Sequence, residues 1–243
     1  SVAATVETAA SSKSVRSELP ANLSWVDATG LTNVTLLQTV GSPPLRSVEQ
    51  LYWNRSITAE ALVGAALPTD VYAAPRVRVA RDGTLLGVGS NVLVQDYAAS
   101  AQFANARLVA TAGTFSLWSA DSAPRLSLLE QGRFSDGWLA RTGKLTVWPD
   151  AAGRTRGTVR FTLSLPASGV PTTVRFGKAH YDIHPGERTT VIYTIDARGP
   201  WSLAFSTPKG GGAQSDLRFT SVLSTTPVLT RADEPGVRLT SNA

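Results

Sequence analysis

Strict alternation of apolar and polar side chains runs through Thr158-Val159-Arg160-Phe161-Thr162-Leu163-Ser164-Leu165. Successive side chains of a β-strand point to opposite faces, so this pattern predicts a strand with one face in a core and one in water. On either side of it, six further strands are expected at 125–130, 144–148, 173–177, 189–195, 200–206 and 217–224. Seven short strands separated by Gly- and Pro-containing turns, with no convincing helix between 122 and 235, are typical of an antiparallel β-sandwich of jelly-roll or Ig-like type.

The preceding part of the chain has a mixed pattern. Ser47–Trp53 has helical spacing, with Ser47 as the expected N-cap, and Val34–Gln38 is an apolar run typical of a strand. Hairpin turns are expected at Arg81–Thr84, because of its Asp-Gly pair, and at Thr111–Gly113. The predicted fold is therefore mainly β. It consists of a flexible lead-in (1–18), a small mixed α/β subdomain (19–121) packed on a carbohydrate-binding-like β-sandwich (122–235), and a polar tail (236–243).

The amino-acid composition limits the classes of partner that this chain could bind. Lys and Arg number 23 against 18 Asp and Glu, which gives a net charge of +5, but the cations are scattered rather than clustered among aromatic residues. A nucleic-acid partner is therefore not expected, whereas contact with an acidic polymer or anionic lipid headgroups stays open. The absence of Cys excludes disulfides and thiolate metal sites. No run of 18 apolar residues occurs, so a membrane span within this chain is not expected.

Metal binding was considered at the two histidines. His180, Asp182 and His184 would share one face of a strand, which is a permissible ligand spacing. No further His or Cys completes a four-ligand sphere, and Pro185 follows at once, so the prediction is no transition-metal site and no cofactor. Ca²⁺ is the exception left open, because Asp82 and Asp136 stand beside glycine turns and carboxylates suit this ion.

Two short stretches suit a sugar. Asp136-Gly137-Trp138 places an indole beside a carboxylate, a pair that can cover a sugar face and accept its hydroxyl hydrogen bonds, and Trp148 is a candidate second platform. Trp53 and Asn54 form a similar aromatic and amide pair. The alternatives are a core tryptophan beside a structural turn and an amphipathic helix end. Asp136 has no evident carboxylate mate, so glycoside hydrolysis is not predicted.

A resemblance rests on the order of several short motifs between residues 22 and 225. Among them are Trp53-Asn54-Arg55-Ser56 and Gly132-Arg133-Phe134-Ser135-Asp136-Gly137-Trp138. This order resembles the C-terminal extracytoplasmic domain of actinobacterial polytopic (GT-C type) glycosyltransferases, which use polyprenyl-phosphate sugars; cell-wall arabinofuranosyltransferases are one such group. The family's W-N-x-x-(F/Y)-N-R-S motif is present here only in compressed form.

The resemblance implies a role in the bacterial envelope. The chain would be a non-catalytic accessory domain of a glycosyltransferase at the periplasmic, extracytoplasmic face of the cell membrane. Its partners would be a cell-wall polysaccharide or glycolipid acceptor and a membrane domain of the same polypeptide, which would carry the catalytic residues. The alternative is a structural domain that interacts with a protein or lipid headgroups and has no glycan site.

Overall fold

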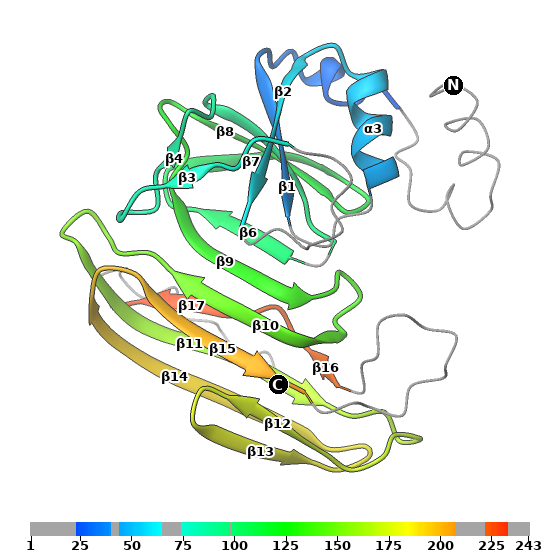
Figure 1. Ribbon diagram of the computed structural model, residues 1–243, viewed down its shortest axis with the longest axis vertical. Coiled ribbons are helices and arrows are strands. Elements are labelled where there is room, and N and C mark those ends of the chain that lie inside the picture. Colours follow the sequence, from blue (N-terminus) through cyan, green and yellow to red (C-terminus); the bar gives the residue numbers. More distant parts are fainter. Residues whose placement is uncertain (1–22, 40–43, 65–73, 98, 208–221, 233–243) are drawn as a thin grey trace, which may run out of the picture.

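The computed structural model describes residues 23–39, 44–64, 74–97, 99–207 and 222–232 (Figure 1). Within these ranges one α-helix and one short 3-10 helix accompany seventeen strands, so the prediction of a mainly β fold with a sandwich is confirmed. The predicted lead-in and tail, and most of the strand expected at 217–224, lie outside the described residues. No helix in the described ranges is both long and apolar enough to span a bilayer.

The N-terminal lobe is built on a five-stranded mixed sheet with the order β2-β1-β5-β8-β7. Its strands are β1 (Val34–Thr39), β2 (Ile57–Val63), β5 (Asn91–Gln95), β7 (Ala106–Ala112) and β8 (Phe115–Ala120). β1 runs parallel to both β2 and β5, and the helix α3 (Pro44–Trp53) makes the crossover that a parallel neighbour requires. The short 3-10 helix η1 (Asp27–Thr29) and the small hairpin of β3 (Arg78–Val79) and β4 (Leu85–Leu86) complete this lobe.

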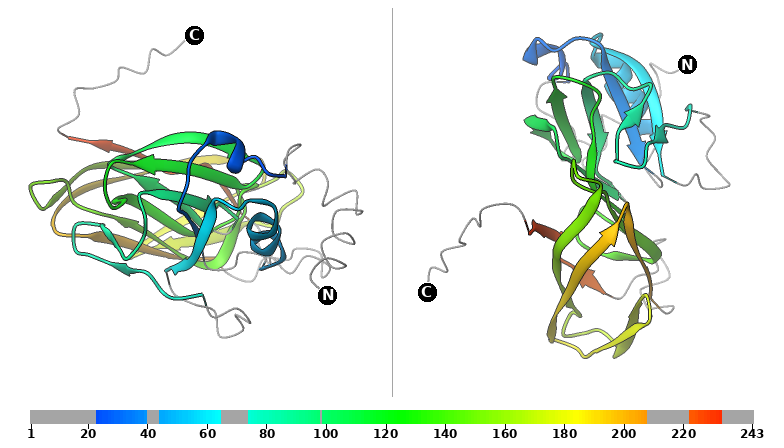
Figure 2. Two further views of the ribbon diagram at one scale, coloured as in Figure 1. Left: turned by 90° about the horizontal axis from the view of Figure 1, so that it is seen from above. Right: turned by 90° about the vertical axis from the view of Figure 1, so that its left-hand side faces the viewer.

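The second lobe is a β-sandwich of two facing sheets. The six-stranded sheet has the order β13-β12-β15-β10-β9-β6, and the other sheet has β14-β11-β16, with β17 also paired to β11. The bounds are β6 (Ala99–Phe103), β9 (Leu126–Arg133), β10 (Leu139–Val147), β11 (Arg154–Ser164), β12 (Thr172–Phe176), β13 (Ala179–Ile183), β14 (Arg188–Arg198), β15 (Trp201–Ser206), β16 (Leu223–Ser224) and β17 (Val228–Arg231). The two lobes are stacked one above the other in the right-hand view of Figure 2.

Three hydrophobic cores hold these layers together. One fills the sandwich, with Phe161 and Phe176 among its largest members. A second lies between the five-stranded sheet and β6 and β9 of the six-stranded sheet. A third lies on the other face of the five-stranded sheet, where Trp25 and Val26 cover it beside α3. Burial of both faces explains why the middle of β5, Val92–Val94, is apolar throughout and why three of the first four residues of β9 are leucines.

Local patterns agree with the structure at the turns and less well at helix α3. The hairpin turns at Asp82-Gly83 and at Gly113 are present, and Gly83 adopts a φ of 93° that favours glycine. The helix begins at Pro44, so Ser47 lies inside it and the predicted N-cap role is wrong. The Ser47 hydroxyl instead donates to Gln95 Oε1 at 2.9 Å, which ties the helix to β5.

The chain crosses between the lobes more than once. The five-stranded sheet ends at Ala120, next to the predicted boundary at residue 121, but β6 lies before that boundary and pairs with β9 in the six-stranded sheet. An isolated bridge also joins Thr84 to Arg125. The lobes are therefore connected by backbone pairing as well as by the second core.

Candidate functional site

Asn54, predicted as a sugar ligand, is a structural residue. Its side chain is fully buried, Oδ1 accepts from the Val26 amide at 2.9 Å, and Nδ2 donates to the Gln50 and Leu23 carbonyls at 3.0 and 3.1 Å. These bonds join α3 to the segment before η1. The Asn54 amide could bind a sugar only by giving up these buried hydrogen bonds. The prediction of Asn54 as a glycan ligand is therefore wrong.

Trp148 is also buried. It belongs to the core between the two lobes, 7% exposed, and a Cβ placed on Gly83 would come within 2.9 Å of its Cγ. Its indole therefore has no face open to a sugar, and its proposed role as a second platform is corrected. Trp53 differs, because it is 39% exposed and packs edge-on against Tyr52 with ring centroids 4.9 Å apart.

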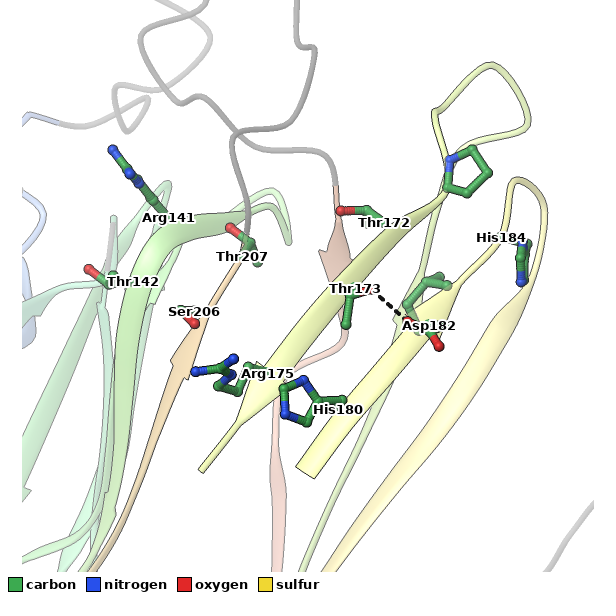
Figure 3. Close-up of a pocket in the computed structure, with 12 residues that line it drawn as sticks. Arg141, Thr142, Thr172, Thr173, Arg175, His180, Asp182, His184, Ser206 and Thr207 are labelled. Atoms are coloured by element: carbon green, nitrogen blue, oxygen red, sulfur yellow. Dashed lines mark hydrogen bonds between the residues drawn. The ribbon is translucent and has the colours of Figure 1, made fainter. Parts of the chain in front are cut away.

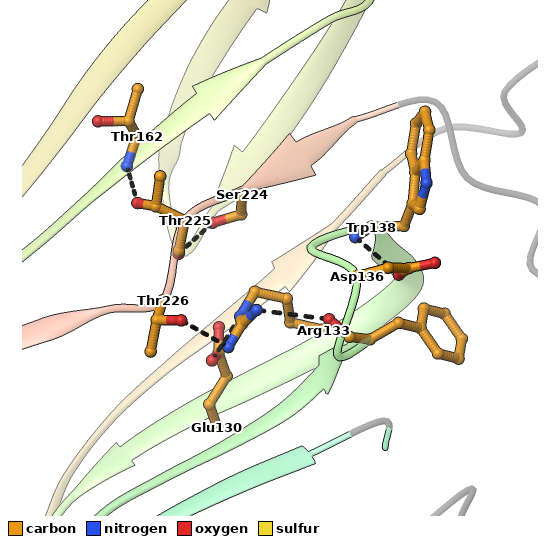
Figure 4. Close-up of polar contacts among 9 residues, drawn as sticks. Glu130, Arg133, Asp136, Trp138, Thr162, Ser224, Thr225 and Thr226 are labelled. Atoms are coloured by element: carbon orange, nitrogen blue, oxygen red, sulfur yellow. Dashed lines mark hydrogen bonds and ion pairs between the residues drawn. The ribbon is translucent and has the colours of Figure 1, made fainter. Parts of the chain in front are cut away.

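The Asp136-Gly137-Trp138 turn joins β9 to β10 (Figure 4). Gly137 has a φ of 93°, and two backbone bonds close the turn: the Phe134 amide donates to the Trp138 carbonyl, and the Gly137 amide donates to the Phe134 carbonyl. Asp136 is exposed and its Oδ1 accepts weakly from the Trp138 amide at 3.4 Å, while Trp138 is half-buried and pairs through its backbone with Leu223. This turn and the exposed Trp53 come from different lobes, and neither lines the pockets described next.

One pocket is an open groove on the six-stranded sheet (Figure 3). Its volume is about 860 Å³, and β10, β12, β13 and β15 supply most of its lining. The groove is lined by polar side chains that share a capacity to hydrogen-bond: Arg141, Thr142, Thr172, Thr173, Arg175, His180, Asp182, His184, Ser206 and Thr207. The strands pair in the order β13-β12-β15-β10, so residues far apart in sequence meet on one surface.

The groove offers several kinds of hydrogen-bonding group to a ligand. Arg141 and Arg175 supply guanidinium donors, and His180 lies directly across from Arg175 in the β12–β13 pair. The single carboxylate, Asp182, accepts a 2.6 Å bond from the Thr173 hydroxyl. In the part of the chain that the structure describes, no three His, Cys, Asp or Glu side chains gather closely enough to hold a metal ion. The sequence pattern indicated the two histidines as candidate metal ligands, and it did not indicate either arginine.

A smaller pocket of about 220 Å³ lies where the two lobes meet. Arg133 is buried in its wall, and its Nε donates to Glu130 Oε2 at 2.7 Å (Figure 4). Its two Nη atoms donate to the Phe134 carbonyl at 3.4 Å and to the Thr226 hydroxyl at 3.1 Å. Asp96 lines the same pocket, and its Oδ2 accepts from the Ser116 hydroxyl at 2.7 Å.

Both carboxylates of this region have raised pKa values. Burial raises the pKa of Glu130 to about 7, against the opposing charge and hydrogen bond of Arg133. Burial likewise raises the pKa of Asp96 to about 6, although the Ser116 hydroxyl, the backbone at Ala101 and the Arg133 charge act in the other direction. Nothing local in the sequence distinguishes Asp96 and Glu130 from surface residues, and Arg133 is noticeable there only as part of the Gly132–Trp138 motif.

Comparison with known proteins adds little. No family profile matches the chain, and no curated protein matches it. One structural neighbour is the Arthrobacter globiformis T6 isomalto-dextranase complexed with panose, at 11% identity and a TM-score of 0.25. That similarity covers 72% of this chain and 40% of the dextranase, and a likeness this weak carries no argument about function.

Proposed function

We propose that this chain is a non-catalytic, carbohydrate-binding accessory domain of a bacterial envelope glycosyltransferase, and that its groove on the six-stranded sheet holds the acceptor polysaccharide. The observation that carries the proposal is the open groove of about 860 Å³, lined by hydroxyls, two guanidiniums and two imidazoles. An open groove admits the middle of a polymer, whereas a closed pocket admits only an end or a small molecule. The resemblance of the sequence motifs to such enzymes supports the same assignment.

The donors of the groove suit a hydroxylated ligand that also carries negative charge. Arg141 and Arg175 each offer a fork of N–H groups, which bind carboxylate or phosphate oxygens in a bidentate manner. The threonine and serine hydroxyls can both donate to and accept from sugar hydroxyls. Hydrolysis would require two carboxylates facing the scissile bond, and Asp182 is the single carboxylate among the residues that line the groove.

A binding role needs only modest affinity. If a membrane domain of the same polypeptide carries the active site, tethering raises the effective concentration of an acceptor held in the groove. The chain would then lie at the extracytoplasmic face of the membrane, with the polysaccharide or glycolipid acceptor as its partner. Asp136 and Trp138 stay candidate contacts at the β9–β10 turn, and Trp53 stays one on the other lobe.

The decisive experiment is an NMR titration of the chain with neutral and acidic cell-wall glycan fragments, compared with the Arg175→Ala variant. The proposal expects saturable shifts in β12, β13 and β15, and at least tenfold weaker binding of the variant, because a lost charge-assisted bond costs about 1.5–3 kcal/mol. Arg107→Ala, at an exposed site on β7, is the matched control and should bind normally. If no glycan fragment changes the chemical shifts of these strands, the proposal is refuted.

A second candidate function follows from the outer face of the β11–β14 sheet. Alternation places five arginines on this face: Arg154, Arg156, Arg160, Arg188 and Arg198. Asp196 is the one acidic side chain that β11 and β14 place there, so five positive and one negative charges give this face a net +4, out of +5 for the whole chain. This distribution favours an interaction domain that docks on anionic lipid headgroups.

Apolar residues on the same face strengthen the lipid interpretation. Ile192 and Val228 are 52% and 54% exposed, and both lie directly opposite Arg160 on its two neighbouring strands. Exposed aliphatic groups beside a guanidinium suit the boundary between headgroups and acyl chains. If this candidate holds, sedimentation with vesicles containing anionic lipid should depend on Arg160 and Arg188, and Arg160→Glu should abolish it. Equal sedimentation of the variant would exclude this candidate.

A further inference from the structure

The small pocket at the junction of the lobes contains an incomplete set of hydrogen bonds. Asp96 Oδ1 is buried and has no hydrogen-bond partner of normal geometry among the described residues. Arg133 has five N–H donors, of which three are used by Glu130, Phe134 and Thr226 within the described part of the chain. An unused buried acceptor and unused buried donors therefore belong to side chains that line one cavity.

These two groups do not satisfy each other. Arg133 forms its ion pair with Glu130, at 2.7 Å, and no ion pair within 4.0 Å joins it to Asp96 among the described residues. The positive charge of Arg133 nevertheless acts to lower the pKa of Asp96, so the two groups are close enough to interact electrostatically. The Ser116 hydroxyl donates to Asp96 Oδ2, so the unsatisfied atom is Oδ1. A buried oxygen without a donor costs free energy, which a ligand in the pocket would recover.

We propose that this pocket binds a single uncharged polyol of the size of one sugar ring, held between Asp96 and Arg133. A hydroxyl group donates and accepts at once, so adjacent hydroxyls can donate to Asp96 Oδ1 and accept from the free N–H groups of Arg133. Ser100, Ser135 and Thr226 add hydroxyls at the wall, and Phe115 adds an apolar surface for the C–H side of a ring. The volume of about 220 Å³ has room for one ring and not for a polymer.

The charges exclude two other ligand classes. Asp96 and Arg133 line the pocket, and Glu130 pairs with Arg133 beside it; when all three are ionised, their net charge is negative, which disfavours phosphate and other anions. A divalent cation would meet the buried guanidinium of Arg133, and Ca²⁺ needs six to eight oxygen ligands, whereas Asp96 is the single carboxylate among the residues that line the pocket. A neutral polyol is the class that matches both free groups.

This pocket and the groove share no lining residue. Either can therefore bind while the other does not, and a variant of one leaves the other intact. A polymer lying in the groove and a single ring in the pocket would be separate ligands, and the pocket would recognise a chain end or a free small molecule.

The test is an NMR titration of the whole chain with the methyl glycosides of arabinofuranose, galactofuranose, mannopyranose and glucopyranose, and separately with sodium phosphate and calcium chloride. The proposal expects saturable shifts at the amides of Asp96, Ser116 and Ser135 with at least one glycoside. The isosteric Asp96→Asn should weaken that binding at least tenfold, since it replaces the charged acceptor, whereas Asp121→Asn at an exposed site should bind normally.

Two further variants keep the result interpretable. Thr226→Val removes the hydroxyl that holds Arg133 Nη2 at the exposed rim, and a severalfold loss is expected even if Asp96→Asn proves unstable. Arg175→Ala, in the groove, should leave the pocket shifts unchanged, so that failure of the groove and failure of the pocket are told apart. Absence of pocket shifts with all four glycosides, or pocket shifts with phosphate or calcium alone, would overturn the proposal.

Discussion

Leu128 and Leu129 are neighbours in β9 but lie in different hydrophobic cores. Leu128, 1% exposed, packs inside the sandwich, and Leu129, 4% exposed, packs between the sandwich and the N-terminal lobe. Successive side chains of a strand point to opposite faces, so β9 is a wall common to both cores. The two lobes therefore share a strand as well as an interface.

Leu128→Ala and Leu129→Ala should each destabilise the whole chain by about 2–5 kcal/mol, because each leaves a cavity in a packed core. Since β9 serves both cores, unfolding in urea should stay a single transition that moves to lower denaturant in both variants. The measurement is urea denaturation followed by tryptophan fluorescence and circular dichroism. Two separate transitions, with only one of them moved by each variant, would contradict the shared wall.

Gly83→Ala should be among the most damaging small substitutions. Gly83 has a φ of 93°, and an added Cβ would stand 2.4 Å from the Leu126 carbonyl and 2.9 Å from Trp148 Cγ. Backbone strain and overpacking each cost about 1–3 kcal/mol. The melting temperature should fall clearly in this variant. Gly153→Ala is the control, because Gly153 also has a positive φ but no atom lies within 4 Å of the added Cβ, and its melting temperature should fall less. Equal losses would show that packing against Trp148 contributes nothing.

The sequence predicts most of the sandwich strands but misses β13 and β17, and it does not reveal that β9 is a wall shared by two cores. A strand with one wet face alternates, as Thr158–Leu165 does, and β11 follows the predicted range closely. The run Leu126–Leu129 contains three leucines and one serine, which indicates a buried strand but does not show that its two faces enter different cores. The strand β6, Ala99–Phe103, has small and polar residues and was not predicted, since its pairing with β9 is non-local.

The candidate sites were harder to predict than the fold. Asn54 and Trp148 have side chains suited to a ligand or to a core, and residue type alone does not separate the two uses. The groove depends on the order β13-β12-β15-β10, which brings Arg141 and Arg175 to one surface from distant parts of the chain. Asp96 and Arg133 likewise meet only through the packing of the two lobes.

Arg133→Ala should cost about 3–5 kcal/mol of stability at neutral pH, because it leaves the buried Glu130 carboxylate without its cation. Removing both charges, as in Glu130→Leu with Arg133→Leu, should cost much less or stabilise the chain, since well-packed apolar residues often replace a buried pair without loss. Urea denaturation at pH 7 of the wild type, the single variant and the double variant checks this. A double variant as unstable as Arg133→Ala would show that the hydrogen bonds to Phe134 and Thr226 matter more than the charge.

The raised pKa of Asp96 predicts how stability changes with pH. The unfolded chain loses this proton near the ordinary value of 3.8, whereas the folded chain keeps it to about pH 6. Between these limits the folded state binds more protons, so the Asp96 contribution to the free energy of unfolding falls as pH rises from about 4 to about 6. At about 1.4 kcal/mol per pKa unit, the total fall is about 1–3 kcal/mol.

The difference between wild type and Asp96→Asn isolates this contribution. Asp27, Asp82 and Asp196 have lowered pKa values and contribute the opposite slope, but they are the same in both proteins and cancel. Relative to wild type, Asp96→Asn should therefore become more stable as pH rises from 4 to 7, with most of the change complete by about pH 6.5. The free energy of unfolding of Asp121→Asn should change with pH in the same way as that of the wild type. If Asp96→Asn also runs parallel, the carboxylate is not buried in solution, and the pocket is open to water.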